Sequence, residues 1–135
     1  MAKFLVLADE CCGKGDYDSA LEYYRKALEI TRAEHGNHPS TASVLYRMGD
    51  MCETRGDYPK ALEYYQQSLE IRRATIGLNH PDTARAYYSL ANVYDCLGDC
   101  GRAEQFYRQA LEINLATVGR SHVDTASTYH GLGNA

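Results

Sequence analysis

The sequence predicts an all-α fold in which antiparallel helix pairs stack in a row. Two observations support this: phrases of the sequence return at a period of about 42 residues, and each period holds two stretches with the apolar spacing of an α-helix. No stretch alternates apolar and polar residues with β-branched bias, so we expect no strand. We predict one domain, a single array over residues 1–135, with repeats at about 1–38, 39–80 and 81–122 and with 123–135 as the first helix of a fourth.

Two phrases define the period. Gly15–Tyr24 returns 41 residues later as Gly56–Tyr65, and Gly98-Asp99 reopens the same phrase after a further 42 residues. The second phrase places a histidine every 42 residues, in Asn37-His38-Pro39, Asn79-His80-Pro81 and Ser121-His122-Val123. A fixed period of this length is typical of repeat architectures whose units bury their apolar faces only by stacking.

The first helix of a period is clearest in residues 81–97. Four residues share one helical face at i, i+3, i+4 and i+7: Tyr87, Leu90, Ala91 and Tyr94. Pro81 stands in the first turn, where its missing N–H costs nothing, and Asp82 stands where the helix dipole favours an anion. Gly98-Asp99 then ends the helix.

The second helix is clearest in residues 101–117. Its apolar residues follow the same spacing: Ala103, Phe106, Tyr107, Ala110, Leu111 and Ile113. Gly119 stands where a left-handed C-terminal residue belongs. Carried to the other copies by the period, the pattern predicts helices at residues 2–13, 17–34, 39–55, 58–75, 81–97, 101–117 and 123–135.

Five columns of the repeat carry a family resemblance. Each first helix has a small residue where helices cross and a large residue just before it, and each second helix has small, aromatic and small residues in turn. The columns are Ala8, Gly49, Ala91 and Gly133; Leu7, Met48, Leu90 and Leu132; Ala20, Ala61 and Ala103; Tyr24, Tyr65 and Tyr107; and Ala27, Ser68 and Ala110.

With these columns the chain resembles a tetratricopeptide-repeat (TPR) array. Its 42-residue period, with His-Pro before the first helix, is similar to the repeats of kinesin light chain and nephrocystin-3. The resemblance implies a right-handed α-solenoid of antiparallel helix pairs, a TPR superhelix. It also implies a protein–protein interaction scaffold that binds a peptide or partner segment in a concave groove.

Two features depart from the family pattern. The proline that often closes a shorter repeat is missing, because the second helix runs on through Leu115-Ala116-Thr117. Kinesin light chains favour two adjacent asparagines before the Leu-Ala of the first helix, where this chain has Tyr46-Arg47 and Tyr88-Ser89. The tryptophan-acidic cargo peptides of kinesin light chains are therefore not assumed as ligands.

Composition excludes several classes of partner. A net charge of −4, with 14 basic residues scattered along the chain, argues against nucleic acid. The longest apolar run, Phe4–Ala8, is far shorter than a membrane span or a signal peptide core. We therefore expect a cytoplasmic protein that binds no membrane.

The five cysteines are interpreted as reduced thiols. Cys11-Cys12 and Cys96-x3-Cys100 lack the paired CxxC spacing of a zinc site, so we expect no metal and no cofactor. Cys11 and Cys52 recur at the point of the repeat where Tyr94 stands later, which is typical of a small core residue.

Catalytic motifs are missing, and we expect no enzyme. The sequence has no Gly-rich phosphate loop, HExxH or nucleophile elbow. Three of the five histidines, His38, His80 and His122, mark the same loop point in successive repeats. They are interpreted as residues that start a helix rather than as catalytic bases.

The candidate peptide-binding residues lie on the first helix of each pair, which the resemblance places along the concave side. They are Asp9, Tyr46, Asp50, Glu53, Arg85, Tyr88, Asn92, Asp95, His130 and Asn134. Tyr46 and Tyr88 share a column beside the core stripe. Any solvated helix face carries such residues, so a purely structural role stays open as the alternative.

The charge of this surface selects its partner. Arg85 is its only basic residue, against four carboxylates, whereas arrays that clamp the carboxylate tail of a chaperone use several basic residues. We expect a basic, amphipathic peptide instead. Two alternatives stay open: a sensor or spacer segment of a larger NTPase or signalling protein, and an array that self-associates end to end through the apolar residues Phe4–Leu7, Tyr129 and Leu132.

Overall fold

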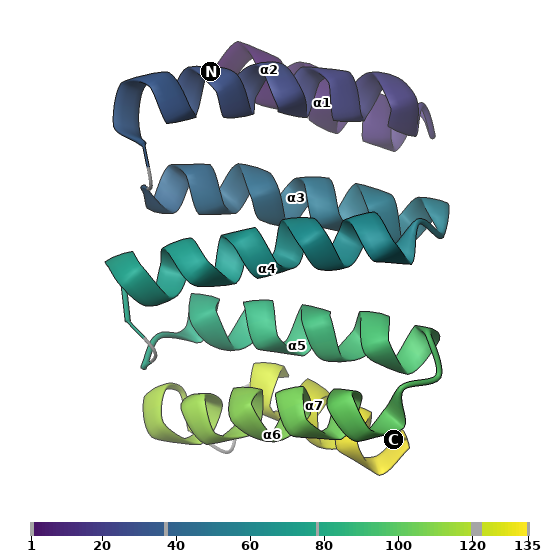
Figure 1. Ribbon diagram of the computed structural model, residues 1–135, viewed down its shortest axis with the longest axis vertical. Coiled ribbons are helices and arrows are strands. Elements are labelled where there is room, and N and C mark those ends of the chain that lie inside the picture. Colours follow the sequence, from purple (N-terminus) through teal and green to yellow (C-terminus); the bar gives the residue numbers. More distant parts are fainter. Residues whose placement is uncertain (1, 37, 78, 120–122, 135) are drawn as a thin grey trace. The chain divides into compact units, whose positions relative to one another are not determined.

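The computed structural model describes residues 2–36, 38–77, 79–119 and 123–134, without the side chains of Ala2, His35, Val123, Asp124 and Asn134. Over these ranges the chain is all-α and has no strand (Figure 1). The helices are α1 (Ala2–Gly13), α2 (Tyr17–His35), α3 (Pro39–Arg55), α4 (Tyr58–Thr75), α5 (Pro81–Cys96), α6 (Cys100–Thr117) and α7 (Val123–Asn134). Every predicted helix is present, and each end lies within one residue of the prediction.

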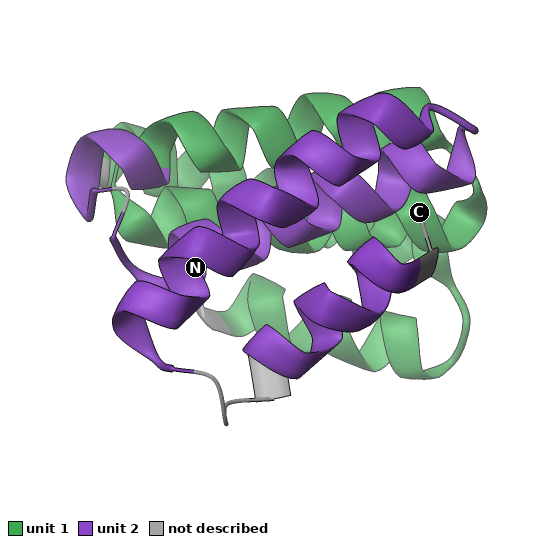
Figure 2. Ribbon diagram, turned by 90° about the horizontal axis from the view of Figure 1, so that it is seen from below, with its two compact units in different colours: residues 1–71 green, residues 72–135 purple. Residues whose placement is uncertain are grey.

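The chain divides into two compact units, residues 1–71 and 72–135, with the boundary inside α4 (Figure 2). In the first unit α2 packs against both α1 and α3, and α4 packs on α3, where the Ser68 hydroxyl donates to the carbonyl of Ala42 at 2.8 Å. In the second unit α6 packs against α5 and α7, and α5 also contacts α7. Each unit contains the predicted helix pairing, and a single array over residues 1–135 stays a prediction.

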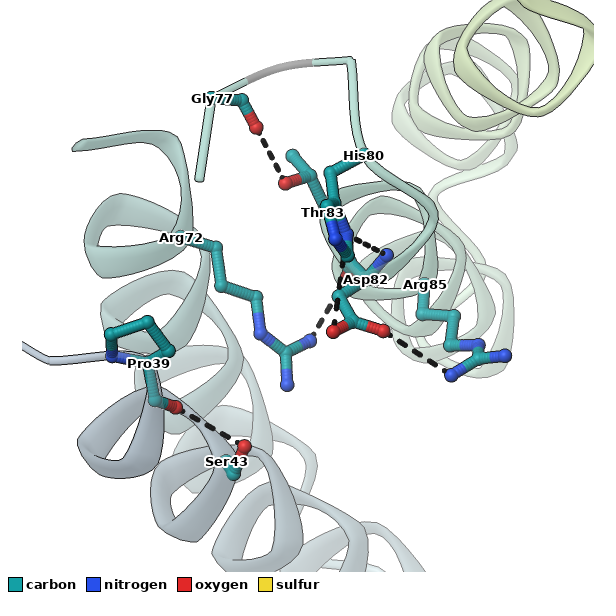
Figure 3. Close-up of polar contacts among 8 residues, drawn as sticks. All are labelled: Pro39, Ser43, Arg72, Gly77, His80, Asp82, Thr83 and Arg85. Carbon is teal, nitrogen blue, oxygen red and sulfur yellow. Dashed lines mark hydrogen bonds and ion pairs between the residues drawn. The ribbon is translucent and has the colours of Figure 1, made fainter. Parts of the chain in front are cut away.

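A histidine is the N-cap residue of both α3 and α5. Nδ1 of His38 accepts the backbone N–H of Ser40 at 3.1 Å, and Nδ1 of His80 accepts that of Asp82 at 3.0 Å (Figure 3). Each bond satisfies an N–H that would have no partner inside the helix. The interpretation of these histidines as helix-start residues is confirmed, while His122 lies outside the described residues.

A threonine closes the loop before α3, α5 and α7. In each case the threonine hydroxyl donates, at 2.7 Å, to the carbonyl of the glycine that follows the preceding helix. The pairs are Thr41–Gly36, Thr83–Gly77, which Figure 3 shows, and Thr125–Gly119. Gly119 has φ of 84°, as predicted for a left-handed C-terminal residue. The loops therefore share one set of bonds, which sets the start of each first helix.

Small residues lie where helices approach closely. Ala8 and Ala91 are fully buried, and Gly49 lies against the ring of Tyr65. The prediction that Gly133 fills this role in α7 is wrong: Gly133 is exposed, and a Cβ there would meet nothing within 4 Å. Gly49 packs against the helix that follows it in the chain, whereas the close approach in α7 is at Gly131, against Tyr107 of the helix before it.

The five cysteines differ in burial. Cys52 is 2% exposed, which confirms its prediction as a core residue, and burial raises the pKa of its thiol. Cys11 is half-buried, while Cys96 and Cys100 are exposed. Within the described ranges no three His, Cys, Asp or Glu side chains lie together as a metal site requires.

Candidate peptide-binding surface

Three core tyrosines on second helices reach polar residues on first helices. In each pair the tyrosine hydroxyl donates to a side-chain oxygen 15 residues earlier in the chain. The pairs are Tyr24 with Asp9 Oδ1 at 2.8 Å, Tyr65 with Asp50 Oδ1 at 2.5 Å, and Tyr107 with Asn92 Oδ1. The constant separation makes this bond a feature of the repeat.

The polar partners therefore have a structural role in addition to the predicted binding role. The three tyrosines are at most 2% exposed, and a buried phenol hydroxyl needs a hydrogen-bond partner. Asp9, Asp50 and Asn92 supply that partner from the surface of the first helix and tie the two helices of a pair together. Asn134 belongs to the same column, but its side chain lies outside the described part of the chain.

Tyr46 and Tyr88 lie beside these bonds, each packed against a core tyrosine. The ring centroids of Tyr46 and Tyr65 are 5.3 Å apart at an interplanar angle of 55°, and those of Tyr88 and Tyr107 are 5.7 Å apart at 61°. Both outer tyrosines are half-buried, as their column beside the core stripe predicted. Each of these two rings is therefore held by a buried ring and stays partly exposed.

The first unit places two carboxylates on one phenol. Besides its bond to Asp50, the hydroxyl of Tyr65 lies 2.9 Å from Glu53 Oε2. Burial raises the pKa of Glu53, the Tyr65 hydroxyl lowers it, and the neighbouring Asp50 carboxylate raises it further. A phenol has one proton, so when both carboxylates are ionised one of the two contacts lacks a proton. A protonated Glu53 or an incoming cation relieves this.

Arginines modify the predicted charge of the surface. Nη1 of Arg47 lies 3.3 Å from Asp9 Oδ2, so the count of Arg85 as the only basic residue is corrected: Arg47 partly neutralises Asp9. Arg85 itself lies 3.3 Å from Asp82 within α5 (Figure 3). Arg47 could not be placed from the sequence because its neighbour Asp9 is 38 residues away and on another helix. Both pairs are exposed, and such pairs contribute little to stability.

The remaining candidates follow the same helix faces. On α5, Arg85, Tyr88, Asn92 and Asp95 occur at i, i+3, i+7 and i+10, with Asp95 half-buried. On α3, Tyr46, Asp50 and Glu53 occur at i, i+4 and i+7. His130 is exposed on α7. The structure therefore brings the candidates together as one set on α3 and another on α5.

A pocket lies among the three helices of the second unit. Its lining residues are Ala84, Arg85, Tyr88, Asn114, Ser127 and Thr128. Only Arg85 and Tyr88 were predicted as site residues. Ala84 lies beside them on α5, whereas Asn114, Ser127 and Thr128 belong to α6 and α7, and only the packing of these helices against α5 brings them to the same place.

The model of one protein family matches most of the chain. It is described as "Tetratricopeptide repeat", and it matches residues 2–74 and 48–116. The chain belongs to the tetratricopeptide-repeat family. A search of curated protein sequences finds no match.

Solved TPR structures have the same fold. BtubC (BKLC) from P. vanneervenii is 25% identical, with a TM-score of 0.88 over 97% of this chain and 53% of that chain. The nearly identical TPR-like repeats of a Podosopora anserina protein assigned as a kinesin light chain are 21% identical, with a TM-score of 0.85 over 98% of this chain and 64% of that one. The chain thus spans half to two thirds of these neighbours.

These comparisons confirm the predicted fold class, an α-solenoid of antiparallel helix pairs, and the resemblance to kinesin light chain repeats. TPR repeats generally mediate protein–protein interaction, and the fold is typically non-catalytic. No helix of the described TPR chain is long and apolar enough to cross a membrane.

Proposed function

We propose that this TPR segment is a scaffold that binds an extended or helical segment of a partner protein on the open faces of its first helices. The observation that carries the proposal is a cluster that occurs in both units: a half-buried tyrosine packed on a core tyrosine whose hydroxyl is held by a polar residue. The two clusters are Tyr46–Tyr65–Asp50 and Tyr88–Tyr107–Asn92.

The outer tyrosines are suited to anchor a ligand. A tyrosine offers a large amphipathic surface, and such residues contribute strongly when they pack at an interface. Because Tyr46 and Tyr88 already rest on buried rings, binding orders them at little entropic cost.

Charge in the first unit favours a basic ligand. Asp50 and Glu53 lie within reach of one phenol hydroxyl, and burial together with the neighbouring Asp50 carboxylate raises the pKa of Glu53. A lysine or arginine side chain of the partner would be attracted to these two carboxylates. We infer that a basic, amphipathic segment binds here.

The second unit presents an amide in place of a carboxylate. Asn92 accepts the Tyr107 hydroxyl through Oδ1, which leaves its N–H groups to donate to a peptide carbonyl. Such a bond fixes a peptide backbone without reading its sequence. Specificity then comes from the tyrosines and from charge.

A peptide-library pull-down followed by titration of the selected peptides tests the proposal. We expect basic peptides with micromolar affinity, about −8 kcal/mol, that bind more weakly as salt rises. Tyr46→Ala and Tyr88→Ala should each lose about 1–2 kcal/mol of binding. Tyr64→Ala is the matched control, because Tyr64 is also half-buried but lies on a second helix, α4. Selection of acidic peptides, or equal binding by all three variants, would refute the assignment.

The other roles stay predictions. A sensor or spacer segment within a larger NTPase or signalling protein uses the same helix pairs without a ligand, and its first-helix tyrosines would tolerate alanine. End-to-end self-association would use exposed apolar residues such as Val6, which is 56% exposed. Location in the cytoplasm also stays a prediction.

A further inference from the structure

One buried polar atom of the second unit has no hydrogen-bond partner. Asn114 of α6 is 2% exposed, and its Nδ2 donates to Thr128 Oγ1 at 3.3 Å. Its Oδ1 is buried and unpaired, the only such side-chain atom in the described part of the chain. A buried acceptor without a donor lowers the stability of the unbound protein, so an unpaired Oδ1 at this position needs a physical reason.

The equivalent residues of the other repeats are paired. Arg72 occupies this column one repeat earlier in the chain and Thr31 two repeats earlier. The Thr31 hydroxyl donates to the carbonyl of Ala27 at 2.8 Å, and Nη1 of Arg72 donates to the carbonyl of Asp82 at 3.0 Å (Figure 3). On α7, Thr128 stands where earlier first helices have the apolar residues Val44 and Ala86. The polar Asn114–Thr128 pair therefore belongs to this repeat and is not required by the repeat fold.

Asn114 and Thr128 both line the pocket described above, together with Ala84, Arg85, Tyr88 and Ser127. We propose that this Asn114 pocket is a subsite for an uncharged hydrogen-bond donor of the partner, a primary amide such as a glutamine or asparagine side chain. The identity of its ligand as part of a protein partner rests on the function proposed above.

The lining selects a neutral amide by its chemistry. The amide N–H donates to Asn114 Oδ1, and the amide oxygen can accept from the hydroxyl of Ser127. The positive charge of Arg85 at the same pocket repels an ammonium or guanidinium group, and the unpaired oxygen of Asn114 repels a carboxylate. Ala84 and the ring of Tyr88 contact the apolar stem of the side chain.

Entry requires a small movement of the lining. Oδ1 has almost no solvent contact in the unbound chain, so a ligand reaches it only after side chains rotate. A ligand with an N–H group gives Asn114 Oδ1 the hydrogen-bond donor that it lacks, whereas an apolar ligand of equal shape leaves this atom unpaired. The predicted signature is therefore discrimination between a donor and its donor-free isostere.

Small probes test this without any peptide. Propionamide and 2-butanone have nearly the same shape, but only propionamide has N–H groups. We titrate each into ¹⁵N-labelled protein and follow the amide signals of Ser127 and Thr128 and the side-chain NH₂ of Asn114. We expect a saturable shift with propionamide and a dissociation constant at least about fivefold higher for 2-butanone.

Two variants and one control identify the atom. Asn114→Thr copies the residue of the first repeat, whose hydroxyl bonds its own helix, and Asn114→Leu is a second variant that also removes Oδ1. Both should lose the preference for propionamide, and Gln109→Leu, which removes an exposed amide from the same helix, should keep it. Equal affinity for the two probes, no saturable shift with either, or an unchanged preference in both Asn114 variants would overturn the subsite.

A second experiment, with peptides, tests whether the pocket takes part in binding the partner. In a peptide selected as above, replacing its glutamine or asparagine by leucine should weaken binding to the wild type about tenfold and leave binding to Asn114→Thr unchanged. Loss of equal size in both proteins would overturn the role of the pocket in partner binding. If no peptide is selected, the function proposed above fails, and the probe titration still decides whether the pocket takes an amide.

Discussion

Gly49 and Gly131 lie where two helices are too close for a side chain. A Cβ at Gly49 would lie 2.7 Å from both Cδ1 and Cε1 of Tyr65, and a Cβ at Gly131 would lie 2.6 Å from Cε1 of Tyr107. Carbon atoms in contact are normally about 3.5–4.0 Å apart. An alanine at either position therefore requires the tyrosine ring to move by about 1 Å.

The ring of Tyr65 cannot move without loss. It is fully buried, its hydroxyl lies within hydrogen-bond distance of Asp50 and Glu53, and its ring packs on that of Tyr46. Overpacking of a core costs about 1–3 kcal/mol, and a broken hydrogen bond costs about 1 kcal/mol. The better helix propensity of alanine offsets about 0.5–1 kcal/mol of this. We expect Gly49→Ala to lower the free energy of unfolding by about 1–3 kcal/mol.

Gly133→Ala is the matched control for Gly131→Ala. Both glycines lie in α7, but a Cβ at Gly133 meets nothing within 4 Å. Only the helix propensity then changes, so Gly133→Ala should raise the free energy of unfolding by a few tenths to about 1 kcal/mol. Two substitutions that are two residues apart should thus differ in sign.

Urea denaturation followed by circular dichroism and by tyrosine fluorescence measures these changes, and coincident transitions justify a two-state treatment. A double-mutant cycle sharpens the test. In a Tyr65→Phe background the ring has lost its hydroxyl bonds, so Gly49→Ala should cost less than in the wild type. A Gly49→Ala protein at least as stable as the wild type would show that this close approach does not exist.

Three further changes have predicted outcomes. Because burial raises the pKa of Glu53 above its usual value of 4.5, ionised Glu53 destabilises the folded state. The stability of the protein with a protonated Glu53 is therefore lost as pH rises from 4.5 through the raised pKa. Glu53→Gln should melt at a higher temperature than the wild type at pH 7, and this difference should shrink toward pH 4.5. A lower melting temperature of Glu53→Gln at pH 7 would contradict this. His80→Ala should lose about 1 kcal/mol in urea denaturation with the N-cap bond of α5, whereas His80→Asn, which keeps an acceptor, should lose much less; equal losses would show that Nδ1 does not cap the helix. If the exposed Val6 mediates end-to-end association, sedimentation velocity should show growth with concentration in the wild type and none in Val6→Lys, and a wild type that stays monomeric would exclude it.

The helices could be predicted because the signals that determine them are local. Apolar spacing, Gly-Asp and His-Pro lie within or next to each helix, and the ends predicted from them agree with the structure to one residue. Small residues at crossings were predicted correctly where a following helix packs on them, as at Gly49. The prediction for Gly133 was wrong because the close approach in α7 is at Gly131, against Tyr107 of the preceding helix.

The candidate site was only partly predictable, because its contacts join residues far apart in the chain. Asp9 and Arg47 are 38 residues apart, and nothing in the pattern of either helix indicates their pairing. Asn114 stands in a column that otherwise holds Thr31 and Arg72, so the sequence alone does not show that its acceptor is unpaired. The tyrosine bonds had a signal, a polar residue 15 positions before each core tyrosine, that could have indicated them.

The double role of that polar column decides how binding at Asn92 must be measured. Asn92→Ala removes both the acceptor of the Tyr107 hydroxyl and the N–H donors offered to a ligand, so a loss of affinity could follow from a displaced ring. Tyr107→Phe separates the two effects, because it removes the hydroxyl and leaves the Asn92 amide in place. In that background Asn92→Ala should cost little stability and still lose about 1–2 kcal/mol of peptide binding, measured by denaturation and titration of the same proteins. If the loss of binding vanishes with the hydroxyl, Asn92 only holds the helix pair together, and the ligand is bound by the tyrosines alone.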